Sequence, residues 1–472
     1  MKKTVQLSFI LLVIFTSLAK EGKSKKTRWH DLLICQKFHK KAANSLKTKL
    51  DTTGNKRSPS LESEDNERLN LSIQYRPRTE HRNGYKKLLA DSSRPAFITN
   101  QRSRLSLSYS NSSFRSKISF QDIRTWGESK NKSDIPSLLL HEAWFELPLA
   151  ESLSLRIGRQ VLKYSDQRLL AASNWNNVGS THDMALMKYR QKNADVHLGV
   201  AYNNDENRLT EAYSNYPGSF YKSMQFLYAS KQFGDNLNVS LLEIADGHQK
   251  EKSNKKIYWR TTIGLNLDYS TTDNKFNTST KAYWQGGKNQ YGNTNNAYFL
   301  TLQLSYAFQN LKITAGTDYF SGNDQLDTND QVNRAFDNLY GSGHRYLGHM
   351  DYFRAVDKHT NGGGINDVFL KMGYEFSKKT SAKVAYHHFS LANRVIDKNH
   401  TGPGLKAIDS ELGSELDFTL NYRHSKNFSI KTGYSLMFAK ESMETITGGN
   451  HENLASWGFI MFSFHPQISL NN

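Results

Sequence analysis

The side chains best suited to chemistry are arginines that recur at strand-like spacing in the first third of the sequence. In RLNLSIQYRPRTEHR, residues 68–82, apolar side chains take odd positions, whereas Arg76, Arg78, Glu80 and Arg82 take even ones. Successive side chains of a β-strand point to opposite faces, so one face is apolar and the other carries guanidinium groups. Guanidinium groups bind carboxylates through paired hydrogen bonds, and a ring of them in a pore attracts anions.

More arginines, and an acid, follow in the next segments of this kind. We expect these residues to join the first four on one inner face: Arg102, Arg104, Arg124, Arg156, Arg159, Asp166 and Arg168. Two roles are open to such a surface. It can select anions, or its arginines can pair with acids such as Glu142 and Glu146 and hold the wall together. The two roles do not exclude each other.

Other chemistry is less well supported. The sequence contains no G-x-S-x-G, H-E-x-x-H, P-loop or dinucleotide-binding motif, so we expect no enzymatic activity. Asp324, Asp327 and Asp330 could supply oxygen ligands to Ca²⁺, although their spacing is not that of an EF-hand, and no other cofactor is expected. His387 and His388 are adjacent in a strand-like segment, so they face opposite sides and cannot chelate one metal.

The composition fits half-exposed β-structure. Hydrophobic residues make up 37% of the 472 residues and aromatic residues 12%, with only 8 prolines. A disordered chain would not carry so many aromatic side chains. The single cysteine, Cys35, excludes an internal disulfide framework.

The N-terminal region predicts export. Residues 1–19, MKKTVQLSFILLVIFTSLA, combine a basic start, a short apolar core and small residues at a cleavage site, which is typical of a signal peptide. The core is too short to span a membrane as a helix. Residues 20–67 form a Lys-rich arm, of which 20–57 alone carries half of the formal charge of +18. The arm is either a solvated leader or a short amphipathic helix at anionic lipid, and nucleic acid is not an expected partner of an exported chain.

Alternation of apolar and polar residues recurs from residue 68 to 465 in about eighteen segments of roughly ten residues, the length that a tilted strand needs to cross a bilayer. Short turns and long loops alternate between the segments. Tyrosines of one parity precede six short turns and indicate an aromatic girdle at a membrane interface: Tyr109, Tyr189, Tyr269, Tyr306, Tyr374 and Tyr422. The sequence therefore predicts an all-β fold, a transmembrane antiparallel up-and-down β-barrel with about 18 strands over 68–465, followed by a C-terminal tail at 466–472.

Two motifs resemble those of the alginate export family of outer-membrane barrels. The first is the R-x-R-x-E-x-R pattern of YRPRTEHRNG, described above. The second lies in LRIGRQVLKYSDQRL and matches at Gly158, Arg159, Gln160, Tyr164, Asp166, Gln167, Arg168 and Leu169. Ser165 stands where the family usually has glycine, at an expected tight turn. A later stretch, FDNLYGSGHRYLGHMDYF, is also similar.

The resemblance covers residues 68–465 and implies an eighteen-stranded monomeric barrel whose arginine-rich lumen passes an anionic polyuronate. It implies the outer membrane of a Gram-negative-type bacterium, contact with lipid and lipopolysaccharide, and insertion by the barrel assembly machinery. We therefore expect a channel for anionic or polar saccharides. The alternatives are a general diffusion porin, a plugged barrel that serves as an adhesin or enzyme, and a soluble secreted β-protein. The long loop 321–365 could fold inward as a gate, with the glycines after Asn361 as its hinge.

Overall fold

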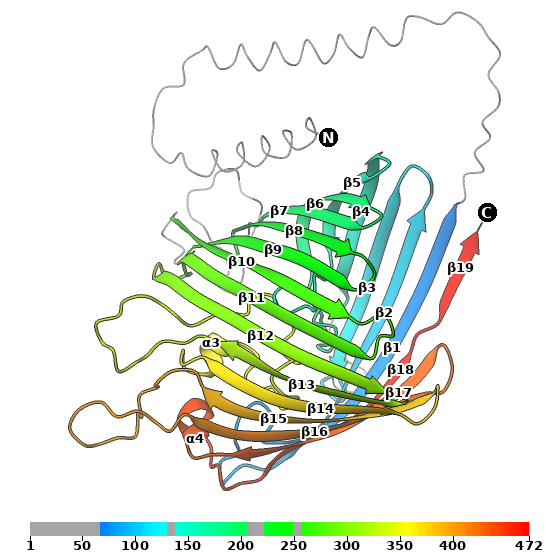
Figure 1. The fold of residues 1–472 in the computed structure, drawn as a ribbon. Helices are drawn as coiled ribbons and strands as arrows, with labels where there is room; N and C mark the ends of the chain where they lie inside the picture. The colour runs from blue at the N-terminus through cyan, green and yellow to red at the C-terminus, as the bar shows by residue number, and fades with distance from the viewer. Residues whose placement is uncertain are drawn as a thin grey trace, which may run out of the picture. The chain divides into compact units, whose positions relative to one another are not determined.

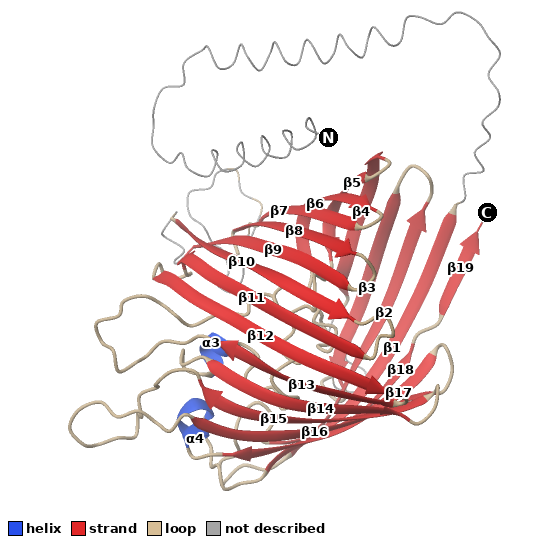
Figure 2. Cartoon of the chain, in the orientation of Figure 1, coloured by secondary structure: helices blue, strands red, loops and turns tan. Residues whose placement is uncertain are grey.

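The computed structural model describes residues 67–129, 137–204, 207, 209, 221–249 and 256–471. The expected signal peptide and all but the last residue of the Lys-rich arm lie outside these residues. The described residues belong to one compact unit, Asp65–Asn472, which is an antiparallel β-barrel (Figure 1, Figure 2). None of the helices in the described ranges is long and apolar enough to cross a membrane.

The segments with alternating side chains form the wall, as predicted. The strands are β1 (Arg68–Asn83), β2 (Ala96–Ser110), β3 (Arg115–Thr125), β4 (Leu139–Ala150), β5 (Leu153–Gln160), β6 (His182–Gln191), β7 (Ala194–Tyr202), β8 (Ser223–Phe233), β9 (Leu237–Gln249), β10 (Ile257–Ser270), β11 (Phe276–Lys288), β12 (Thr294–Phe308), β13 (Leu311–Phe320), β14 (Ile365–Glu375), β15 (Thr380–Leu391), β16 (Glu411–Arg423), β17 (Phe428–Ala439), β18 (Ala455–Phe464) and β19 (Gln467–Asn471). Two short helices, α3 (Val356–His359) and α4 (Ser442–Thr447), lie in loops.

The barrel closes at β1, which pairs with β2 on one side and with β18 and β19 on the other. β18 and β19 occupy one position in the wall and are separated by His465 and Pro466, so the wall has eighteen positions. The residues after 466 were expected to form a tail beyond the barrel, but Gln467–Asn471 extend the wall along β1. Ile468 and Leu470 are exposed there and continue the outward apolar face of the last strand.

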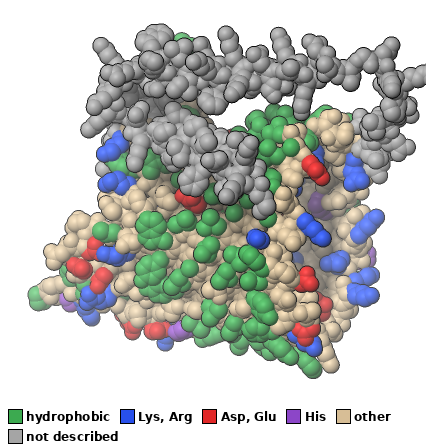
Figure 3. Space-filling model, turned by 45° about the horizontal axis from the view of Figure 1, so that its top comes forward, with side chains coloured by type: hydrophobic (Ala, Val, Ile, Leu, Met, Phe, Trp, Pro, Cys, Tyr) green, Lys and Arg blue, Asp and Glu red, His purple; other side chains and the backbone are tan. Residues whose placement is uncertain are grey.

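Short turns connect the strands at one end of the barrel, and longer loops connect them at the other, apart from the five-residue connection between β11 and β12. Outward side chains between the two ends are apolar, and Figure 3 shows apolar groups across the outer face of the wall. The tyrosines beside the short turns are exposed at Tyr189, Tyr269, Tyr306, Tyr374 and Tyr422, as a membrane-interface girdle requires. Because backbone groups in lipid must be paired, the closed ladder is what allows this apolar surface to face a membrane.

Two long connections pack against the inner side of the wall. They are the β5–β6 loop, residues 161–181, and the β13–β14 loop, residues 321–364. Several of their apolar side chains are almost fully buried, among them Leu170, Phe336 and Phe353. The loops also bind each other through their backbones, since Ala171 N donates to Tyr340 O at 3.1 Å. The barrel is therefore narrowed by a folded plug rather than left as an open tube.

The glycines expected to form a hinge have a different role. A Cβ atom on Gly322 would lie 2.0 Å from the carbonyl carbon of Gly363, so only glycine lets the two ends of the β13–β14 loop pass each other. Gly362 and Gly364 have φ of 80° and 68°, which L side chains rarely adopt. These residues thus fix the base of the loop by close packing.

Candidate functional site

Strand register decides which side chains face the lumen. Arg76 lies opposite Arg102, and Gln74 lies opposite Arg104. Directly opposite residues of antiparallel strands share a face, so these groups form one inner surface. Ile73, of the other parity, is exposed on the outer face. The arginines of β1 and β2 therefore point inward, as expected.

Arg76, Arg78 and Arg102 hold the β5–β6 loop. Arg76 donates to Asn174 O at 2.7 Å, and Arg78 donates to Trp175 O at 2.9 Å. Arg102 is fully buried and donates to Asn177 O at 3.2 Å and to Asn174 Oδ1 at 2.9 Å. We call residues 174–177 the constriction segment. Three guanidinium groups bind its backbone carbonyls, so the arginine surface fixes this segment in place.

Glu80 is the acidic centre of the β1 surface. Its carboxylate accepts hydrogen bonds from Arg78 at 2.8 Å and from Arg82 at 2.9 Å, and also from the indole of Trp457 at 3.0 Å. Glu80 is buried, whereas the side chain of Arg82 keeps 30% of its surface exposed. The R-x-R-x-E-x-R pattern is thus an ion-pair cluster in which one carboxylate binds two of three arginines, so the cluster stays positively charged, and Arg82 is more exposed than Arg78.

Two arginines expected in the lumen point outward instead. Arg124 lies opposite Gln101 and shares a parity with exposed Phe120, and it pairs with Asp122 at 2.8 Å. Arg159 lies opposite Asp183 and pairs with it at 2.7 Å. Arg159 is three positions from inward Arg156, and residues an odd number apart in a regular strand face opposite sides. Both outward pairs stand at the long-loop ends of their strands.

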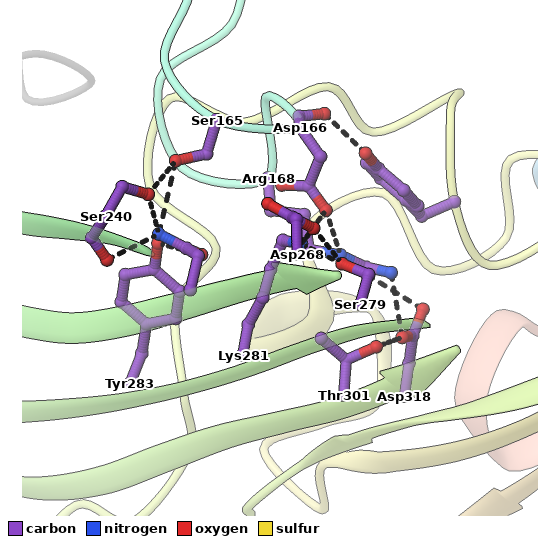
Figure 4. A network of polar contacts seen from close by, with 12 residues as sticks. Ser165, Asp166, Arg168, Ser240, Asp268, Ser279, Lys281, Tyr283, Thr301 and Asp318 are labelled. Carbon is purple, nitrogen blue, oxygen red and sulfur yellow. Dashed lines mark hydrogen bonds and ion pairs between the residues drawn. The ribbon is translucent and has the colours of Figure 1, made fainter. Parts of the chain in front are cut away.

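Arg168 and Asp166 lie in the β5–β6 loop and anchor it to the wall. Arg168 binds both carboxylate oxygens of Asp318 on β13, each at 2.8 Å, and its Nε lies 3.1 Å from Asp166 (Figure 4). Thr301 donates to the same Asp318 carboxylate at 2.6 Å. Burial alone would lower the pKa of Arg168, but the carboxylates of Asp318 and Asp166 raise it overall. This network is a structural tie between loop and wall.

The turn that carries Asp166 explains the family's usual glycine. Ser165 has a φ of 49°, in the left-handed region that glycine adopts without steric cost. Its hydroxyl accepts a hydrogen bond from Asn266 Nδ2 at 3.2 Å (Figure 4). This contact to β10 offsets part of the backbone strain, so a serine is tolerated at this position.

A cavity of about 690 Å³ lies on the short-turn side of the constriction segment. We call it the short-turn cavity. Its lining carries one carboxylate, Glu142, and these six basic side chains: Arg104, Lys117, Arg156, Lys163, Lys188 and Arg190. Glu146, behind the lining, binds Arg156 at 2.6 Å and Lys188 at 2.7 Å. Within the described part of the chain, Arg104 and Lys163 form no ion pair, so they give this cavity a net positive potential.

A second cavity, of about 500 Å³, lies on the long-loop side and is called the long-loop cavity. Asn174 lines the first cavity, whereas Trp175, Asn176 and Asn177 line the second, so the constriction segment separates the two. The basic residues of the long-loop cavity are Arg78, Arg82, Lys86 and Arg354, and its one carboxylate is Asp351. Basic side chains therefore predominate on both sides of the constriction segment.

The structure also reveals a row of lysines that the sequence analysis missed. Lys312, Lys371, Lys383 and Lys431 have inward parity on β13, β14, β15 and β17, and none forms an ion pair with a described residue. The inward position of these lysines could have been predicted from the sequence, since each lysine alternates with outward, mainly apolar residues in its strand. The arginines of the first strands outnumber these four lysines, and the prediction of the lumen surface rested on arginines alone.

The acidic residues proposed for Ca²⁺ are engaged elsewhere. Asp324 binds Arg394 at 2.5 Å and Asp330 binds Arg334 at 2.6 Å, while Asp327 accepts from the backbone N–H of Asn329 at 3.1 Å. In the ranges that the structure describes, no three His, Cys, Asp or Glu side chains are placed to hold a metal ion. His387 is buried against Asp367 at 2.9 Å, and His388 has the opposite, outward parity.

Comparison with known proteins gives these features a family context. The family model for alginate export matches residues 67–455. The chain belongs to the alginate export family. No curated protein matches it in sequence. The family match and the fold together identify an outer-membrane β-barrel channel.

Solved structures with the same fold include the outer-membrane protein OpdK. Pseudomonas aeruginosa OpdK, solved with vanillate, has a TM-score of 0.58 and 11% identity, over 85% of this chain and 99% of that one. Acinetobacter baumannii OccAB4 has a TM-score of 0.57 at 11% identity, over 85% and 98% of the chains. Acinetobacter baumannii OccAB1 has a TM-score of 0.56 at 14% identity, over 85% and 97%. At these identities the likeness concerns the fold.

Proposed function

We propose that this protein is an outer-membrane channel for carboxylated saccharides. The observation that carries the proposal is the lining of the short-turn cavity, where six basic side chains face one carboxylate. A wall of this kind concentrates anions and repels cations. Hydroxyl and amide groups beside the basic ones, such as those of Ser106, Ser108 and Asn174, suit the hydroxyls of a sugar.

The saccharide would pass between two positively charged surfaces of the lumen. The accessible arginines of β1, β2 and β5 lie on one side, and the lysine row of β13 to β17 lies on another part of the wall. The constriction segment lies on this path and sets its width. We further propose that the long-loop rim meets lipopolysaccharide and that the barrel assembly machinery inserts the chain.

A salt-gradient measurement in a planar bilayer tests this function. We expect a reversal potential that shows anion preference, and a current blocked by a polyuronate or its oligomers but not by a neutral oligosaccharide. An open, unselective channel that neither sugar blocks would instead indicate a general porin. Absence of conductance would indicate a plugged barrel.

One charge reversal sharpens the test. Lys163→Glu places a carboxylate in the short-turn cavity, and Lys378→Glu makes the same change on the exposed β14–β15 turn, outside the lining of both cavities. Lys163→Glu should lower the anion-to-cation permeability ratio by at least about fivefold, since reversing a charge about 8 Å away in water-like surroundings raises the energy of an anion by about 1 kcal/mol and lowers that of a cation by a similar amount. Lys378→Glu should leave the ratio unchanged. Equal effects of the two variants would contradict the proposal.

A further inference from the structure

We infer that the long-loop cavity contains a binding site for the carboxylate of a sugar acid, formed by Lys86 and Arg354. The inference rests on the proposed function, because it assigns a specific binding site to the proposed saccharide. Lys86 belongs to the loop between β1 and β2, and Arg354 belongs to the β13–β14 loop. Both line the same cavity of about 500 Å³.

Hydrogen bonds join the two loops that carry these cations. Lys86 N donates to Met350 O at 2.9 Å, and Tyr352 OH donates to Gly84 O at 2.5 Å. Lys86 itself has a φ of 69°, so its backbone is held in a conformation that few lysines adopt. Two loops far apart in sequence are thus joined at the point where each carries a cation. Strain of this kind is common where a fold positions a ligand.

Neither cation pairs directly with a carboxylate of the described residues. Among the residues that the structure describes, neither Lys86 nor Arg354 forms an ion pair, and Arg354 Nε is buried with no hydrogen-bond acceptor. Trp175 Nε1, in the same cavity lining, is also a buried donor without an acceptor. Buried N–H groups nearly always have a partner. A ligand rich in acceptor oxygens would satisfy donors from both loops and the constriction segment.

The one carboxylate of the cavity does not neutralise these donors. Asp351 accepts from Tyr85 OH at 2.5 Å and from His344 Nδ1 at 2.7 Å. Burial would raise the pKa of Asp351, but these two contacts hold it below its usual value, so the group stays ionised. Burial and, after it, the charge of Arg354 lower the pKa of Lys86. The cavity keeps an excess of positive charge.

The geometry favours a small sugar acid over an aromatic ligand. The guanidinium of Arg78 lies 4.2 Å from the ring centre of Trp175, and the His344 ring stacks at 4.1 Å. Two groups so close to one ring must occupy opposite faces, so Trp175 has no free face on which a ligand could stack. Amide and hydroxyl groups of Asn176, Asn177 and Ser342 remain in the lining for sugar hydroxyls. A volume of about 500 Å³ lies in the range of small-ligand sites.

Calorimetric titration of the detergent-solubilised full chain tests the site without any conductance measurement. The probes are glucuronate, neutral glucose and inorganic phosphate. The variants are Lys86→Met, Arg354→Met and, as a matched control, Lys87→Met. Lys86 and Lys87 are both exposed, but Lys86 lines the cavity and Lys87 does not. Folding of each variant is checked by heat-modifiable migration of the barrel. If Arg354→Met does not fold, the comparison of Lys86→Met with Lys87→Met tests the site.

We expect glucuronate to bind the native chain and glucose to bind at least tenfold more weakly, since a charge-assisted hydrogen bond is about twice as strong as a neutral one. Lys86→Met and Arg354→Met should each weaken glucuronate binding about tenfold or more, and Lys87→Met should not. No glucuronate binding, binding that survives both cavity variants, or tighter binding of phosphate than of glucuronate would overturn the site. Anion-selective conductance without glucuronate binding would leave the channel standing and reject only this inference.

Discussion

The guanidinium of Arg76 donates to the backbone carbonyl of Asn174 at 2.7 Å, so an arginine expected to face passing anions supports the segment that narrows the barrel. The same group also donates to Asn177 Oδ1 at 3.0 Å. Arg76 and its neighbour Arg102 are buried, and their hydrogen-bonding capacity is directed at residues 174–177 and at the wall. The charged groups of Arg76 and Arg102 therefore serve mainly to hold the constriction segment rather than to attract solutes.

Replacing Arg76 should consequently change the width of the path more than its selectivity. We expect Arg76→Met to give a larger and noisier single-channel current, because the constriction segment loses its main hydrogen bonds, at a cost of about 3 kcal/mol in stability. Arg104→Met is the matched control, since Arg104 lines the short-turn cavity and, among the residues that the structure describes, bonds to Gln121 rather than to the constriction segment. The Arg104→Met channel should keep a single-channel current with little noise, and it should lose anion preference. A greater loss of anion preference in Arg76→Met than in Arg104→Met would refute this assignment.

Arg156 and Arg159 provide a second matched pair. Both lie on β5, but Arg156 faces the short-turn cavity and Arg159 pairs with Asp183 on the outer face. Arg156→Gln should reduce anion preference in a salt-gradient measurement. Arg159→Gln should leave it unchanged, because the outer pair is separated from the path by the wall. A shift of the reversal potential in Arg159→Gln would show that its guanidinium reaches the lumen.

The contrast between these two residues shows how far the sequence could predict the structure. Alternation located the strands, their faces and the closed barrel, because strand periodicity is a local property that each segment displays by itself. The same alternation should have separated Arg156 from Arg159, which are an odd number of positions apart. Grouping arginines by type rather than by parity caused that error, and the same grouping placed Arg124 on the wrong face.

The candidate site was less predictable because it depends on contacts between distant segments. Nothing in the local pattern of residues 161–181 or 321–364 indicates that these loops pack against each other inside the barrel. Their positions follow from pairs such as Arg168 with Asp318, which are 150 residues apart. The proximity of Lys86 to Arg354 has the same origin. Of these features, only the inward position of the lysine row could have been predicted from the alternation of residues along the strands.

The Arg168–Asp318 pair should be a major determinant of stability. Asp318→Asn leaves a buried guanidinium without its main counter-ion, so we expect a loss of about 3–5 kcal/mol in the free energy of unfolding. The double variant Arg168→Met with Asp318→Leu should lose less, because no buried charge remains unpaired. Urea titration followed by heat-modifiable migration measures both. A double variant less stable than Asp318→Asn would contradict this account.

The lysine row offers a test that involves no arginine. Replacing Lys371, Lys383 and Lys431 with glutamine removes three inward charges that have no ion-pair partner among the described residues. We expect a clear loss of anion preference with little change in stability, since no ion pair is broken. Substituting three exposed lysines on short turns, Lys378, Lys379 and Lys426, controls for net charge. If both triple variants shift the reversal potential equally, the row has no special part in the path.

Binding of glucuronate should weaken as the pH rises into the alkaline range, and Lys86 should be the cause. Burial, Arg354 and Arg82 lower the pKa of Lys86, whereas Asp351 and Glu80 act in the opposite direction and only partly offset them. Lys86 therefore loses its proton at a lower pH than a free lysine does, while the sugar carboxylate stays ionised throughout. Since only the protonated amine attracts the carboxylate, affinity is fully present below the lowered pKa and is lost above it. Calorimetry from pH 6 to pH 10 measures this loss, and the Lys86→Arg variant should bind with no such decline, because a guanidinium stays charged across the range. An identical decline in Lys86→Arg would assign the pH dependence to another group.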